Sequence, residues 1–142
     1  AVHGWNRVYG SKGFFQYQCA VPVNKAEDAI REILEHIARA GVGSFLAVLK
    51  LFGDVRSPGL LSFPIPGATL ALDFPNNGEK TLRLLDKLDE VTREVGGRVN
   101  PSKDARMHPE DFQQHYQHWK AMEAFIDPCI SSDFWRRVTA QS

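Results

Sequence analysis

The feature that most constrains the fold is the order in which two hydrophobic periods follow each other, one typical of strands and one typical of helices. Residues 14–21 (FFQYQCAV) are rich in aromatic and β-branched side chains, which predicts a strand that ends at Pro22. Asn24 then begins a helix, with Glu27 placed three residues later as in a capping box, and Gly41 ends it. Between these ends, apolar residues recur at helical spacing.

The next part of the chain continues the pattern with two consecutive strands. Residues 44–52 and 69–74 predict the second and third strands, on either side of a loop rich in glycine and proline at 53–67. An amphipathic helix follows from about residue 79 to 95, and residues 98–100 predict a short fourth strand. This order predicts an α+β fold of the ferredoxin-like βαββαβ type, an antiparallel sheet with both helices on one face.

Helical sequence continues beyond the predicted sheet. A turn (PSKDARMHP) leads into a helix predicted over residues 109–125, and a short helix is predicted near residues 132–138. Asp127-Pro128 separates the two helices, because the residue before a proline is biased away from helical conformation. The apolar side chains of the longer helix are interpreted as packing residues: Phe112, Tyr116, Trp119, Met122 and Phe125.

Composition excludes several classes of function. Of the 142 residues, 17 are Lys or Arg and 17 are Asp or Glu, so no net charge draws the chain to nucleic acid or to an anionic membrane. No apolar run approaches the roughly 20 residues of a membrane-spanning helix, and the opening residues AVHGWNR do not form a signal peptide. We therefore expect a cytoplasmic or membrane-associated protein. Cys19 and Cys129 are too few for a disulfide scaffold and are predicted to be two buried thiols.

The two faces of the predicted sheet differ, because side chains alternate across a strand. One side, which we call the helix face, is almost wholly apolar and is predicted to lie under the helices. It carries Phe15, Tyr17, Cys19, Val21, Phe45, Ala47, Leu49, Leu51, Leu70, Leu72 and Phe74.

The other side, which we call the mixed face, combines polar and apolar groups. It carries Phe14, Gln16, Gln18, Leu46, Val48, Lys50, Phe52, Thr69, Ala71 and Asp73. Such a mixture favours a ligand wall or a domain interface; a partly solvated sheet face is the alternative.

Five segments in order carry a resemblance to a known family. They are GWNRVYGSKGFFQYQCAVP, SFLAVLKLFG, LLSFPIPG, LALDFP and GGRVNPSKDAR. Together they resemble the C-terminal domain of the decaprenylphosphoryl-β-D-ribose 2′-oxidase family, from about residue 4 to 137. These are bacterial FAD-linked oxidoreductases of the vanillyl-alcohol-oxidase class, related to the aldonolactone oxidases. The resemblance implies an enzyme that oxidises a secondary alcohol of a sugar or polyol by hydride transfer to flavin, with a role in cell wall biosynthesis.

The resemblance also implies roles for individual residues. Gln16 and Gln18 match glutamines that line the substrate pocket, and Lys50 matches a lysine that reaches the substrate region. The apolar walls beside it are Leu46, Val48 and Phe52. Lys103 matches a lysine placed against the flavin ring and the reacting hydroxyl, which implies both a catalytic and a cofactor-binding role. A fixed ammonium suits that place, because hydride transfer leaves negative charge on the reduced ring.

At three positions the chain departs from the best-known members of the family. Ala71 stands in place of a cysteine, Thr69 in place of an asparagine and Asn100 in place of a tyrosine. All three positions line or border the substrate pocket, so the resemblance leaves the substrate open between a polyprenyl-phosphate pentose, an aldonolactone-type compound and another sugar or polyol. Chemistry that depends on the cysteine thiol is not expected.

The resemblance places the FAD-binding domain in a preceding part of the chain. No glycine-rich loop precedes a helix at phosphate-cradling spacing here, so residues 1–142 are expected to form one substrate-facing domain that neither binds FAD tightly nor turns over substrate alone. The implied partners are the FAD-binding domain, a small sugar substrate and a short-chain reductase, with no nucleic acid. We also expect self-association through the open sheet face.

Other patterns support weaker interpretations. His115 and His118 lie one helical turn apart, but no cysteine or carboxylate pair at ligand spacing accompanies them, so no metal site is expected. Asp73 and Asp104 are lone acids, of a kind usually salt-bridged or solvated. The residues alone also allow a different class of function, a free-standing ferredoxin-like module that binds a small ligand or dimerises through the open sheet face.

Overall fold

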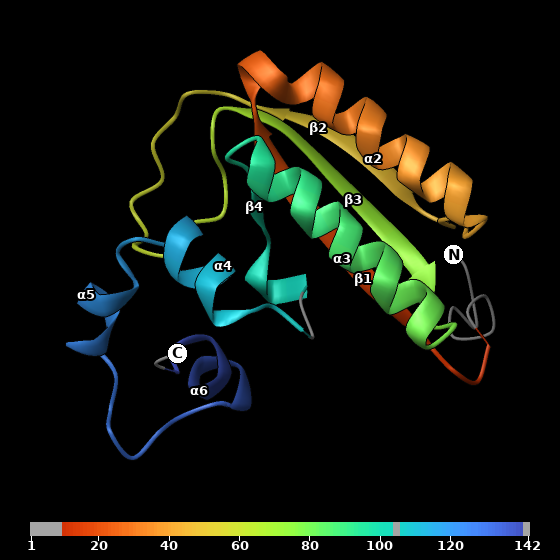
Figure 1. Cartoon of the computed structure of the whole chain (residues 1–142). Helices are drawn as coiled ribbons and strands as arrows, with labels where there is room; N and C mark the ends of the chain where they lie inside the picture. Colours follow the sequence, from red (N-terminus) through yellow and green to blue (C-terminus); the bar gives the residue numbers. More distant parts are fainter. Residues whose placement is uncertain (1–9, 104–105, 141–142) are drawn as a thin grey trace, which may run out of the picture.

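The computed structural model describes residues 10–103 and 106–140, and it contains one four-stranded antiparallel sheet (Figure 1). The strands are β1 (Phe14–Pro22), β2 (Ala47–Phe52), β3 (Gly67–Pro75) and β4 (Arg98–Val99). They lie in the order β2-β3-β1-β4, which is the order of a ferredoxin-like βαββαβ sheet. The predicted α+β fold is therefore confirmed.

Two long helices cover one face of the sheet. They are α2 (Ala26–Ala40) and α3 (Glu79–Glu94), and both lie on the same side of the strands (Figure 1). The core between the helices and the strands is closed, since Cys19, Val21 and Phe74 from the sheet and Ile33 and Leu88 from the helices are all 0% exposed. The alternation along β1 and β3 thus identified the buried side correctly.

The edge strand β2 is an exception to this burial. Leu49 and Leu51 face the same side as the buried Leu70 and Ala68, with which they are paired in register, yet they are 59% and 82% exposed. Phe45, just before the strand, is 60% exposed. The prediction that the helices cover all of these residues is wrong, because the helices lie over β1 and β3 and leave the outermost strand uncovered.

The ends of α2 confirm one predicted signal and correct another. Gly41 adopts a left-handed conformation with φ of 61°, which suits glycine, and ends the helix as expected. The predicted capping box does not form. A short 3-10 turn, η1 (Val23–Lys25), follows β1, so the helix begins after Lys25, and no side chain caps it.

The C-terminal region contains three short helices where two were predicted. They are α4 (Pro109–His115), α5 (Trp119–Glu123) and α6 (Asp133–Val138). The chain leaves helical geometry at Tyr116, whose hydroxyl donates a hydrogen bond of 2.8 Å to the carbonyl oxygen of Val99 in the sheet. Phe112, Tyr116 and Trp119 are buried, as packing residues should be, whereas Phe125 is 77% exposed and does not pack.

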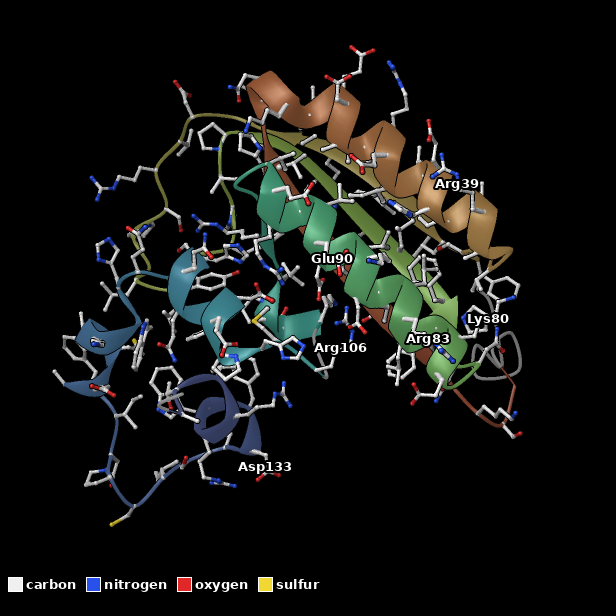
Figure 2. The ribbon with its side chains drawn as sticks, in the orientation of Figure 1. Arg39, Lys80, Arg83, Glu90, Arg106 and Asp133 are labelled. Atoms are coloured by element: carbon white, nitrogen blue, oxygen red, sulfur yellow. The ribbon has the colours of Figure 1, made fainter. Side chains whose placement is uncertain are left out.

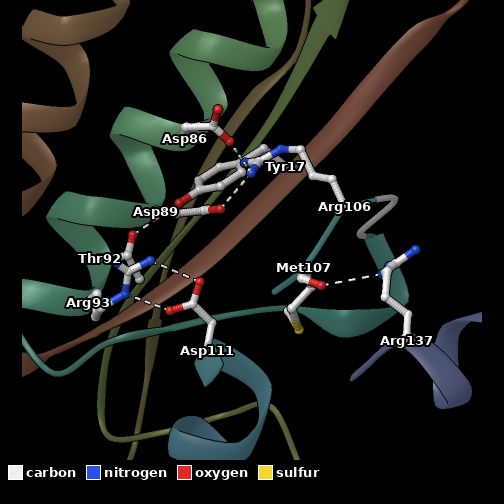
Figure 3. A network of polar contacts seen from close by, with 9 residues as sticks. All are labelled: Tyr17, Asp86, Asp89, Thr92, Arg93, Arg106, Met107, Asp111 and Arg137. Atoms are coloured by element: carbon white, nitrogen blue, oxygen red, sulfur yellow. Dashed lines mark hydrogen bonds and ion pairs between the residues drawn. The ribbon is translucent and has the colours of Figure 1, made fainter. Parts of the chain in front are cut away.

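A network of ion pairs joins α4, and the segment before it, to α3 (Figure 3). Arg93 donates two hydrogen bonds, of 2.5 and 2.9 Å, to the carboxylate of Asp111 on α4. Arg106 donates to Asp86 at 2.7 Å and to Asp89 at 2.8 Å, both on α3. The segment that leaves the sheet after β4 is therefore fixed against α3 at Arg106, just beyond the predicted site residue Lys103.

The two cysteines lie in contrasting places. Cys19 is completely buried in the core, whereas Cys129 is exposed, so the prediction of two buried thiols is wrong for the second. Burial raises the pKa of the Cys19 thiol to about 11. Within residues 10–103 and 106–140, no helix is long and apolar enough to cross a membrane.

Candidate functional site

The structure brings the predicted polar residues together on the mixed face. Gln16 and Gln18 alternate along β1 and face Asp73 and Ala71 on β3 in the antiparallel register. Lys50 on β2 lies opposite Thr69 on β3, with its side chain on the same side of the sheet. Strands β1, β2 and β3 therefore each contribute to one surface, as the alternation of their sequences predicted.

One row of hydrogen bonds crosses this surface near the start of β1. The ammonium of Lys103, in the short 3-10 turn η2 (Pro101–Lys103), donates to Oε1 of Gln16 at 3.3 Å. Nε2 of Gln16 donates in turn to Oδ1 of Asp73 at 3.2 Å. Lys103 is thus brought to the mixed face although it follows the last strand.

A second row lies one pleat further along β1. Nδ2 of Asn100 donates to Oε1 of Gln18 at 2.8 Å, and Nε2 of Gln18 donates to the hydroxyl of Thr69 at 3.1 Å. The Thr69 hydroxyl donates at 2.8 Å to the carbonyl oxygen of Cys19. Both ends of the Gln18 amide are engaged, so its orientation is fixed before any ligand arrives.

The residues of this surface differ in how far a ligand could reach them. Gln16, Lys50 and Lys103 are exposed, and Gln18 and Ala71 are half-buried. Thr69 and Asp73 are only 1% and 4% exposed, so they support the site from beneath. The exposed groups are two ammonium ions and a carboxamide, which can hold hydroxyl oxygens and stabilise negative charge.

Apolar groups border the polar rows. Leu46 is 41% exposed, and Val48 and Phe52 are half-buried. The ring of Phe52 meets the ring of Phe63 edge-on, with centroids 6.0 Å apart. Phe63 belongs to the loop of residues 53–66, so this loop closes one end of the surface.

The structure describes only one of the two lone acids, Asp73 and Asp104. Asp73 is only 4% exposed and accepts the hydrogen bond from Gln16 beneath the surface, so it is not a solvated acid, which was one of the two expectations for it. Asp104 lies outside the described residues. Among the residues that the structure describes, no group of three or more His, Cys, Asp or Glu side chains could hold a metal ion.

One residue of this face was missed in the sequence. Arg98 on β4 lies opposite Ala20 on β1, and Ala20 shares the parity of Gln16 and Gln18, so Arg98 belongs to the mixed face. The strand predicted at residues 98–100 placed Arg98 and Asn100 on one side, but the sequence did not show which strand would lie beside it.

Comparisons with known proteins came from sequence and from structure. The chain is 40% identical over 139 residues to decaprenylphosphoryl-β-D-ribose oxidase of Mycolicibacterium smegmatis, which covers 94% of this chain and 30% of that protein. It is 36% identical over 142 residues to a Streptomyces coelicolor protein described as an uncharacterized protein in the mprA 5′ region, covering 96% of this chain and 38% of that protein. The resemblance seen in the sequence is confirmed, and the chain spans about a third of the length of these relatives.

Two further comparisons add little. No family model matches the chain. A solved structure of prephenate dehydratase from Streptococcus mutans aligns with a TM-score of 0.39 and 13% identity, covering 62% of this chain and 40% of that one. A similarity this low carries no conclusion about fold or function.

Proposed function

We propose that this chain is the substrate-facing domain of an FAD-linked oxidoreductase and that its mixed face forms one wall of the substrate pocket. The reaction is oxidation of a secondary alcohol of a sugar or polyol, with hydride transfer to flavin. The observation that carries the proposal is the gathering of Gln16, Gln18, Lys50 and Lys103 on one accessible face. Support for the enzyme class comes from the 40% identity to an oxidase of a sugar phosphate ester.

The described residues fit one part of a flavin only. Lys103 offers an exposed ammonium that the hydrogen bond to Gln16 holds at the mixed face, which suits the edge of a ring that gains negative charge. The glycines of the described chain lie in turns and loops, at helix ends and at the start of β3, and none forms a phosphate-cradling loop before a helix. The rest of the cofactor is therefore assigned to another part of a longer polypeptide, where it would supply the hydride acceptor.

Each of the four polar groups then has a distinct task. The Lys103 ammonium stabilises the negative charge that develops at the reacting end of the pocket. The carboxamides of Gln16 and Gln18 hold sugar hydroxyls without adding charge, and the fixed Gln18 amide makes that contact orientation-specific. Lys50 lies further along the same face, beside Val48 and Phe52, and binds a more distant oxygen of the substrate.

The substrate pocket differs from that of the best-known family members at its floor. Ala71 is half-buried between the two rows, and it has no thiol to react. Thr69 and Asn100 are tied to Gln18, so these two substitutions act on substrate choice through the position of that amide. We infer that the substrate is a sugar or polyol derivative that places a hydroxyl against Gln18.

The mixed face also defines the partners that we propose. In a longer polypeptide the FAD-binding domain covers this face, and a short-chain reductase would act on the product. When the chain is produced alone, the face has no cover. We therefore expect the isolated chain to self-associate, to bind FAD weakly and to be inactive.

The test uses the full-length polypeptide that contains this chain. Its absorption spectrum would be recorded for flavin, and turnover would be measured with a panel of sugars, polyols and aldonolactones. Lys103→Met should lower kcat by about 10²- to 10³-fold, the usual effect of removing one group that stabilises developing charge. The flavin content should stay unchanged, because the cofactor is held mainly elsewhere.

A matched control is available on the opposite side of the molecule. Lys80 is an exposed lysine at the start of α3 (Figure 2), and Lys80→Met should leave kcat and KM unaltered. The proposal fails if the full-length protein carries no flavin and takes up none. It also fails if Lys103→Met turns over its substrate as fast as the unmodified enzyme.

A further inference from the structure

A polar cavity lies around Arg98, which stands on the edge strand β4 of the mixed face. A space of about 360 Å³ opens between the turn that precedes β4 and the junction of α4 and α5. Its polar lining consists of Arg98, Gln114, His115, Gln117 and His118, with the backbone of Gly96 and Gly97. No acidic residue lines this cavity within the described part of the chain.

Among the described residues, Arg98 is the only formally charged side chain in that lining, and the partners that the structure shows for it carry no opposite charge. One guanidinium N–H donates at 3.1 Å to the carbonyl oxygen of Ser62, and the guanidinium lies 5.4 Å from the ring centroid of Tyr116. Neither partner is anionic. A guanidinium has five N–H donors, so most of them remain available for a ligand.

The other arginines show how unusual this is in the molecule. Many of them are paired with carboxylates on neighbouring helices or within their own helix: Arg31, Arg39, Arg93, Arg106 and Arg136. Arg98 is half-buried and has no carboxylate partner among the residues that the structure describes. Burial lowers the pKa of Arg98, which reflects the cost of keeping its charge away from water without a counter-ion.

The groups around Arg98 can also donate hydrogen bonds. Gln114 and Gln117 each carry an amide with two N–H donors, and His118 is exposed at the rim. Both ring nitrogens of His115 lack a hydrogen-bond partner among the described residues. Burial lowers the pKa of His115, so its ring is neutral and offers one further N–H.

We propose that this cavity binds an oxyanion, with the Arg98 guanidinium as its counter-ion and the neighbouring amide and imidazole groups as additional donors. A phosphate group fits this chemistry best, because it accepts several hydrogen bonds in addition to the fork of an arginine. A carboxylate can also accept the paired hydrogen bonds of the guanidinium, but it offers fewer oxygen atoms to the other donors. The proposal does not depend on the proposed oxidation, since binding requires neither flavin nor turnover.

An adjoining cavity of about 410 Å³ shares Leu60, Arg98 and His118 with the first and is bounded by the loop of residues 53–66. It contains one acid, Asp54, and one further base, Arg56, and both are exposed. Their charges cancel, so Arg98 determines the sign of the field here as well. An oxyanion bound at Arg98 can therefore extend toward either space.

The test is a titration of the full-length polypeptide that contains this chain with inorganic phosphate, monitored by two-dimensional ¹H–¹⁵N TROSY NMR at constant ionic strength. We expect saturable shifts in the backbone signals of Gly97, Arg98 and Gln117, with a Kd of about 1 to 10 mM, as for a small anion held by one charged pair. A parallel titration with acetate tests whether a carboxylate binds at the same site, and acetate should bind more weakly than phosphate.

Two variants separate Arg98 from other basic groups. Arg98→Gln should raise the Kd for phosphate at least about tenfold, the typical effect of losing a charge-assisted hydrogen bond. Arg83→Gln is the matched control. Arg83 is exposed in a different basic cleft, between α2 and α3, together with Arg39, Lys80 and Lys87 (Figure 2), and its loss should leave the Kd unchanged.

Arg98→Lys guards against misfolding of the glutamine variant, because it keeps the charge and much of the side-chain volume. It should fold and bind phosphate several-fold more weakly, since the guanidinium fork is lost. The proposal is overturned if the unmodified full-length protein shows no saturable phosphate binding. It is equally overturned if Arg83→Gln abolishes phosphate binding and Arg98→Gln does not. The same holds if the Arg98 variants disturb the loop at Ser62 but leave the Kd for phosphate unchanged.

Discussion

The two faces of the sheet are built from the same strands but hold their side chains in different ways. On the helix face, Cys19, Val21 and Phe74 are completely buried and are held by packing. On the mixed face, Gln16 and Gln18 are held by hydrogen bonds from Lys103 and Asn100 and remain accessible. The helix face therefore supplies most of the stability. The mixed face contributes less through packing, and its polar groups are held in fixed orientations where a ligand can reach them.

The contrast is weakest at the edge strand β2, where the helix face is also open. Leu49 and Leu51 line a groove of about 390 Å³ with Ile30 and Leu34 of α2. Apolar character alone does not make a face part of the core; a second element must cover it.

The reactivity of the two thiols should differ most. Cys19 is buried in the helix face with a pKa raised to about 11, so a thiol reagent can reach its thiolate only when the core opens. For a domain of ordinary stability, labelling of Cys19 should be slower than that of exposed Cys129 by a factor of about 10³ or more. Mass spectrometry after timed labelling would measure both rates. Rapid labelling of Cys19 under native conditions would show that the helix face is not closed.

Replacing large side chains of the helix face by alanine should lower the free energy of unfolding much more at covered positions than at uncovered ones. Phe74→Ala should lower the free energy of unfolding by about 3 to 5 kcal/mol, because it leaves a cavity in the closed core. Leu51→Ala is the matched control on the exposed edge and should change that free energy by less than about 0.5 kcal/mol. Urea unfolding followed by circular dichroism gives both values. Equal losses for the two variants would contradict the exposure of β2.

The hydrogen bonds beneath the mixed face should contribute less. Thr69→Val removes the donor to the Cys19 carbonyl and the acceptor for Gln18, and it should lower the free energy of unfolding by about 1 to 2 kcal/mol. Thr69→Ser keeps the hydroxyl and should recover most of that loss. The same urea experiment measures both. A Thr69→Val protein as stable as the unmodified one would show that the row through Gln18 does not hold the sheet together.

Much of the candidate site could be predicted from the sequence, because strand alternation is a local property. Gln16, Gln18 and Lys50 lie on one face because side chains alternate along each strand and the antiparallel register of the structure aligns these positions. Lys103 could be placed there only through the family resemblance, since it follows the last strand and turns back to Gln16. The roles of these residues in binding and catalysis remain predictions.

Other expectations failed where they depended on distant parts of the chain. The helix expected at residues 109–125 breaks at Tyr116, because the Tyr116 hydroxyl bonds to β4. The capping box at Asn24 gives way to a 3-10 turn, because the chain leaves β1 at Pro22 and the helix then begins after Lys25. Local propensity correctly predicted a helix in both regions. Where each helix begins or ends was decided by a long-range contact in one case and by the path of the chain out of the sheet in the other.

By itself the sequence determined the order of the four strands and the two long helices and the character of the two sheet faces, because hydrophobic period is set by neighbouring residues. Only the tertiary structure decided which apolar side chains are covered, that Lys103 donates a hydrogen bond to Gln16, and that Arg98 faces a cavity without a carboxylate partner among the described residues. Coverage and charge pairing depend on which elements meet across the fold, and that information is not contained in any single segment.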